Sequence, residues 1–93
     1  MTKMKTKQKL PLFDEKSLYY IGIGDVLNNT RYAAGTVDRI KSGDRKPSIN
    51  FIEKVTLNLR VKKTKYDEAG NDITNEFYTS KNLFGEEYAD IVP

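Results

Sequence analysis

The stretch INFIEKVTLNLRVK, residues 49–62, carries the clearest apolar pattern of the chain. Six of its seven odd-numbered positions are apolar, and Glu53 is the exception. Successive side chains of a strand point to opposite faces, so this period of two predicts a strand with one face on a core. The opposite face would carry Lys54, Arg60 and Lys62 among amides and hydroxyls. The stretch therefore predicts a half-buried strand with a basic outer face.

The flanking segments favour the same class of fold. SLYYIGIGDVL, residues 17–27, is rich in Tyr and Ile and is interrupted by Gly22 and Gly24, which predicts a bent strand rather than a helix. AGN at residues 69–71 can turn a hairpin into a strand within residues 73–84. The predicted fold is mainly β, a four- to five-stranded antiparallel barrel or meander. Residues 1–9 are expected to form a flexible basic arm, and residues 10–93 a single small β-rich domain.

Composition narrows the function classes. The chain has 93 residues, 38% of them hydrophobic, which suffices for one modest core. It contains no Cys and no His, so disulfides, thiolate metal sites and the commonest general base are all excluded. No nucleophile stands beside a base, and no cofactor motif is present. The sequence predicts a non-enzymatic protein without catalytic residues, cofactor or bound metal. It has no apolar run of membrane-spanning length, which predicts a cytoplasmic protein without a membrane partner.

Charge is unevenly distributed along the chain. Residues 38–65 carry a net charge of +6, residues 1–16 carry +3, and residues 66–93 carry −6. A basic middle segment of this kind is typical of a surface that meets a polyanion.

Two segments resemble small β-barrel families. IGDVLNNTRYAAGTVDRI resembles the opening hairpin of SH3-like barrels through its Gly24-Asp25-Val26 and its later Gly-Thr-Val. LRVKKTKYDEAGNDITNEFYTSKNLFGEEYA resembles the central hairpin of bacterial OB domains that bind single-stranded DNA. Both resemblances imply a small nucleic-acid-binding barrel.

A third segment supports an alternative fold. TVDRIKSGDRKPSINFIEKVTLNL is similar to the recognition helix and the following helix of Xre-type helix-turn-helix repressors. The similarity rests on Thr36, Val37, Arg39, Ile40, Ser42, Gly43, Arg45, Pro47 and Ser48. It implies a helix that starts near Pro47 and carries Ile49, Ile52, Val55 and Leu59 on one face. The β reading is preferred because the helical one leaves Phe51 and Leu57 off that face and leaves little chain before Thr36 for two further helices.

The predicted function is nucleic-acid binding, single-stranded or without sequence specificity. Its predicted binding residues are cations of the middle segment and two tyrosines suited to base stacking. They are Arg39, Lys41, Arg45, Lys46, Lys54, Arg60, Lys62, Tyr66 and Tyr78.

Two other classes of function stay open. The first is a small adaptor or inhibitor that binds a protein partner, of the kind that phages and mobile elements encode. The second is a helix-turn-helix transcription regulator. An exposed edge strand of a four-stranded meander would also allow a homodimer through sheet-to-sheet pairing.

Overall fold

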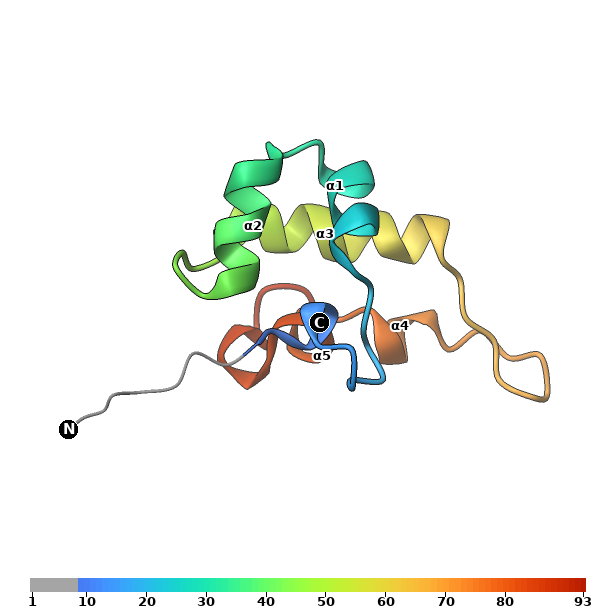
Figure 1. The fold of residues 1–93 in the computed structure, drawn as a ribbon. Coiled ribbons are helices and arrows are strands. Elements are labelled where there is room, and N and C mark those ends of the chain that lie inside the picture. The colour runs from blue at the N-terminus through green and yellow to red at the C-terminus, as the bar shows by residue number, and fades with distance from the viewer. Residues whose placement is uncertain (1–8) are drawn as a thin grey trace.

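The computed structural model describes residues 9–93, and every regular element in that range is helical (Figure 1). The longer helices are α1 (Ile23–Thr30), α2 (Ala34–Ser42) and α3 (Ile49–Lys62). The shorter ones are η1 (Pro11–Phe13), α4 (Thr74–Phe77), α5 (Ser80–Phe84) and η2 (Glu86–Tyr88). The predicted basic arm lies outside the described residues except for Lys9.

The predicted mainly-β barrel, SH3-like or OB-like, is therefore wrong. Within residues 9–93 the only β pairing is one isolated antiparallel bridge between Tyr66 and Asp72, at the expected hairpin turn. The segments on either side of that turn do not pair further, since one belongs to α3 and the other to α4 and α5.

Two features of residues 48–62 stabilise a helix: a capping residue at the start, and apolar side chains at helical spacing. The Ser48 hydroxyl accepts a hydrogen bond from the Phe51 N–H at 3.1 Å, which caps the first turn. Arg60 and Lys62 stand in the last turn, where cations complement the helix dipole. The buried side chains follow helical spacing along one side: Phe51, Ile52, Val55, Thr56 and Leu59.

The strand predicted for residues 49–62 is wrong because part of the apolar pattern fits a strand and a helix equally well. Phe51, Val55 and Leu59 are spaced four apart, so they satisfy both periods. Ile52 is fully buried at an even position, whereas Leu57 and Val61 are 47% and 79% exposed at odd positions. The helical alternative is right for this stretch, although it wrongly expected Ile49, which is 63% exposed, on the buried face.

α1 is short and is held by tertiary contacts. Gly22 precedes it with a φ of 93°, and Gly24 lies exposed within its first turn. Val26 is buried, and the Asp25 carboxylate pairs with Lys63 Nζ at 2.5 Å, just beyond the end of α3. Packing of an amphipathic face thus overrides the poor helix propensity of this glycine-containing segment.

The helices form two layers around one core (Figure 1). The upper layer contains α1, α2 and α3, and the lower layer contains η1, α4 and α5. Phe51 of α3 and Phe84 of α5 meet edge to face across the layers, with ring centroids 6.0 Å apart. Leu12 and Leu83 of the lower layer are fully buried. The core therefore fixes α3, and with it α1 and α2, on a base made by η1, α4 and α5.

Candidate nucleic-acid interface

α1 and α2 are joined by only three residues, 31–33, and this connection is anchored on α3. Arg31 ends α1 in the left-handed conformation with a φ of 60°. The Tyr32 ring packs edge to face on Phe51, with centroids 5.1 Å apart. Asn50 Nδ2 donates a hydrogen bond to the Tyr32 hydroxyl at 2.9 Å. The connection is therefore a fixed part of the fold, and it sets how α2 stands relative to α1.

α2 buries one side and presents the other to solvent. Val37 and Ile40 are buried against the rest of the upper layer and the core. The residues on its opposite side are exposed and include Ala34, Gly35, Asp38, Arg39 and Ser42. The first turn on this side is bare of long side chains, so a flat surface such as a groove wall can approach the helix closely.

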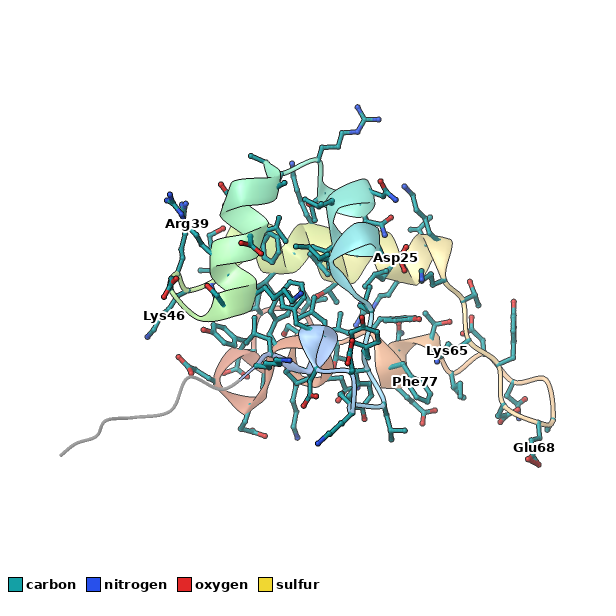
Figure 2. The ribbon with its side chains drawn as sticks, in the orientation of Figure 1. Asp25, Arg39, Lys46, Lys65, Glu68 and Phe77 are labelled. Atoms are coloured by element: carbon teal, nitrogen blue, oxygen red, sulfur yellow. The ribbon has the colours of Figure 1, made fainter. Side chains whose placement is uncertain are left out.

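The loop after α2 adds two more cations. Gly43 ends the helix with a φ of 90°, and the Asp44 N–H donates to the Arg39 carbonyl at 2.9 Å. The loop continues through Arg45 and Lys46, which are both exposed. Figure 2 shows Arg39 and Lys46 at the same end of the molecule, from α2 and from this loop. A helix face flanked by loop cations can neutralise the phosphates of a polyanion and at the same time reach into a groove.

An open groove of about 440 Å³ borders this loop. Its lining includes the apolar residues Leu10, Ile40 and Phe84 and the two cations Arg45 and Lys46. The acidic side chains of η2 also line the groove, and Lys46 Nζ lies 3.8 Å from a Glu87 carboxylate oxygen. Both side chains of this pair are mostly exposed, so solvent screens it strongly and Lys46 can exchange it for a phosphate.

The structure places four of the nine predicted site residues in one segment of the fold. Arg39, Lys41, Arg45 and Lys46 lie on α2 and its following loop. Lys41 is half-buried and lines a small recess with Tyr20 and Phe13, so it faces away from the exposed side of α2. Lys54 is exposed on α3, with Nζ 5.8 Å from the centre of the Tyr32 ring, and so borders the α1–α2 connection.

The other four predicted residues do not join this surface. Arg60 ties the layers together, because its Nε donates to the Tyr78 carbonyl at 2.8 Å and its Nη2 donates to the Pro93 carbonyl. Tyr78 is 6% exposed, and burial raises the pKa of its hydroxyl. Lys62 and Tyr66 are exposed at and beyond the C-terminal end of α3, away from the α2 loop.

Sequence reasoning missed the role of the connection between α1 and α2. Tyr32 and Asn50 hold it in place, although each reads as an ordinary polar residue in the sequence. The local signal that the sequence did contain belongs to the next connection: Gly43 ends α2 and Ser48 caps α3, and the similarity to helix-turn-helix repressors included both residues.

Comparisons with protein-family models, with curated proteins and with solved structures found no match to this chain. Within residues 9–93, no group of three or more carboxylate side chains gathers in a way that could hold a metal ion. None of the helices in that range is both long and apolar enough to cross a membrane.

Proposed function

We propose that the protein binds double-stranded DNA through α1 and α2, which act as a helix-turn-helix, and that it performs no catalysis. In this role α2 enters the major groove, and the loop cations contact the backbone beside it. The observation that carries the proposal is the exposed side of α2, with Arg39 on it and with Arg45 and Lys46 directly after it. The similarity of residues 36–59 to helix-turn-helix repressors supports the same reading.

Duplex DNA fits this surface better than the single strand first expected. Base stacking along a single strand requires exposed aromatic rings beside cations. Tyr32, in the connection before α2, is engaged with Phe51 and Asn50. Tyr20 lies beside Lys41, away from the exposed side of α2. A protruding helix with a bare first turn matches the width of the major groove, which admits an α-helix.

The test compares duplex and single-stranded DNA of random sequence at several salt concentrations. The double variant Arg45→Ala, Lys46→Ala removes two loop cations and should weaken duplex binding for all sequences. The slope of log K against log salt should also become shallower by about 2, since each lost phosphate contact lowers it by about 1. The control variant Lys16→Ala, Lys62→Ala removes the same charge from exposed positions outside this surface and should leave the slope unchanged.

Two results would contradict the proposal. One is an equal loss of affinity in both double variants, which would mean that overall charge rather than this surface attracts DNA. The other is the absence of duplex binding at low salt, which would direct the search to a protein partner.

Selection of bound sequences from a random duplex library then tests whether α2 recognises particular base pairs. Arg39 is the long cation on its exposed side, and arginine recognises guanine by two hydrogen bonds in the major groove. Arg39→Ala should relax the selected sequence at one or two positions and weaken binding to the selected site by about 5- to 100-fold. A selected sequence identical to that of the parent protein would show that Arg39 does not read bases.

A further inference from the structure

We infer that the outer face of α3 is a homodimer interface, on which a second copy of the chain packs in antiparallel fashion around a twofold axis at Leu57. The outer face is defined here as the solvent-exposed side chains opposite the buried stripe. They are Ile49, Asn50, Glu53, Lys54, Leu57 and Val61.

The first argument is the apolar content of this face. Ile49, Leu57 and Val61 are 63%, 47% and 79% exposed, and they belong to one row with four-residue spacing, 49, 53, 57 and 61. At about 100° per residue, Leu57 lies near the middle of the exposed arc, directly opposite the buried stripe. The row covers nearly the whole of a 14-residue helix, which is about 21 Å long. No other helix of residues 9–93 leaves three large apolar side chains exposed in one row.

The second argument is charge complementarity of the face with itself. Glu53 lies on one edge of the outer face, and Arg60 borders the same edge, because their directions differ by only about 20° around the helix. In an antiparallel twofold pairing, each edge of the outer face lies beside the same edge of the second copy. The order of residues along the helix axis is reversed between the two copies. Glu53 is about 6 Å before Leu57 and Arg60 about 4.5 Å after it, so Glu53 would lie level with Arg60 of the second copy. The pairing therefore creates two equivalent ion pairs beside a Leu57 contact.

Both partners of this ion pair are available. Glu53 is exposed and makes no ion pair within the described residues. Arg60 uses Nε and Nη2 for the carbonyls of Tyr78 and Pro93, which fixes the guanidinium and leaves Nη1 for a carboxylate. On the opposite edge the aliphatic stem of Lys54 would cover Val61 of the second copy.

The orientation of the two copies also bears on DNA binding. This consequence of the dimer rests on the proposed function, whereas the arguments for the interface itself do not. Asn50 and Lys54 form the edge that borders Tyr32 at the α1–α2 connection. A twofold axis perpendicular to α3 and parallel to the interface keeps both of these edges on the same side of the dimer. The two α1–α2 units would then face one duplex together, which predicts a site with two inverted halves.

Analytical ultracentrifugation of the full chain without nucleic acid tests the interface separately from DNA binding. Two short helices form a small interface, so we expect a dimer with a Kd of about 1–100 μM. Leu57→Glu places two carboxylates together at the axis and should raise this Kd by at least about tenfold. Leu18→Glu, at a site that is 80% exposed outside α3, is the matched control and should sediment like the parent protein.

Cross-linking identifies the residue at the axis. The chain has no cysteine, so Leu57→Cys introduces a single thiol that can form a disulfide only between copies. The twofold axis brings this thiol close to its own equivalent, and mild oxidation should give a covalent dimer, whereas Leu18→Cys should not.

A parent protein that remains monomeric at about 500 μM would overturn the inference, whatever its affinity for DNA. A dimer that survives Leu57→Glu, or that fails to cross-link through Cys at position 57, would also overturn it, because a different surface would then hold the copies together. Loss of DNA binding with an intact dimer would instead contradict only the proposed function.

Discussion

At the scale of single residues, Thr56 stands out because its hydroxyl is buried without a partner. The side chain is fully buried on α3, and Oγ1 has no hydrogen bond to any of residues 9–93. Thr56→Val keeps the shape and removes the polar atom, so we expect it to stabilise the fold by about 1 kcal/mol. Urea denaturation should show the midpoint rising at an unchanged slope. The same substitution at the exposed Thr64 is the control, and a lower midpoint for Thr56→Val would show that the hydroxyl is satisfied in solution.

Ser48 is a second residue whose contribution to stability can be measured by one substitution. Its hydroxyl caps α3, the helix on which α1 and the connection to α2 rest. Ser48→Ala should cost about 1 kcal/mol of unfolding free energy, and Ser48→Asp should retain most of the stability because a carboxylate also accepts the Phe51 N–H. Thermal unfolding of the three proteins measures this order. Equal stability of Ser48→Ala and the parent would mean that the first turn of α3 is held by packing alone.

At the scale of elements, α3 shows what the sequence could and could not predict. Its apolar residues, its basic residues and its boundaries near Pro47 and Lys62 were all visible. The choice between strand and helix was not, because Phe51, Val55 and Leu59 fit both periods. That choice depends on Ile52 and Thr56 meeting the core and on Leu57 being exposed, which are properties of the packed molecule. The Gly-containing α1 was misjudged for the same reason, since packing rather than propensity holds it.

The turn at residues 66–72 is an element whose stability should depend on pH. The Asp67 carboxylate accepts hydrogen bonds from the main-chain N–H of Asn71 at 2.8 Å and of Ala69 at 2.9 Å. These bonds, that of Asn71 first, lower the pKa of Asp67, and the Thr74 hydroxyl lowers the pKa of Asp72 in the same way. A lowered pKa means that the folded turn favours the carboxylate. Its contribution to stability is therefore present above the ordinary aspartate range and is lost as the pH falls through the lowered pKa.

An NMR titration measures this directly. The Asp67 carboxyl should titrate at a lower pH than an ordinary aspartate does, and the amide protons of Ala69 and Asn71 should shift with the same midpoint. Asp67→Asn should abolish that midpoint and leave the amides of α3 unaffected. Asn71 amide shifts that are independent of pH would show that the turn does not rely on this carboxylate.

At the scale of the whole molecule, part of the candidate site was predictable because it is continuous in sequence. Arg39, Arg45 and Lys46 fall within eight residues, so any fold that exposes this segment brings them together. The contacts of Arg60 and Tyr78 could not be predicted from the sequence, since they join α3 to the lower layer. The same basic character that suggested a ligand-binding face for Arg60 serves to hold the two layers together.

The bonds at Ser80 have a practical consequence for fusion proteins. Ser80 exchanges main-chain hydrogen bonds with the last segment: its N–H donates to the Val92 carbonyl at 2.8 Å, and its hydroxyl accepts the Val92 N–H at 2.9 Å. Val92 is thereby buried, while Pro93 is exposed. A reporter domain joined after Pro93 leaves these bonds intact, whereas a label attached to Lys9 would stand at the groove beside Arg45 and Lys46. For single-molecule or surface-capture work, attachment after Pro93 therefore keeps the core intact and leaves the α2 surface accessible.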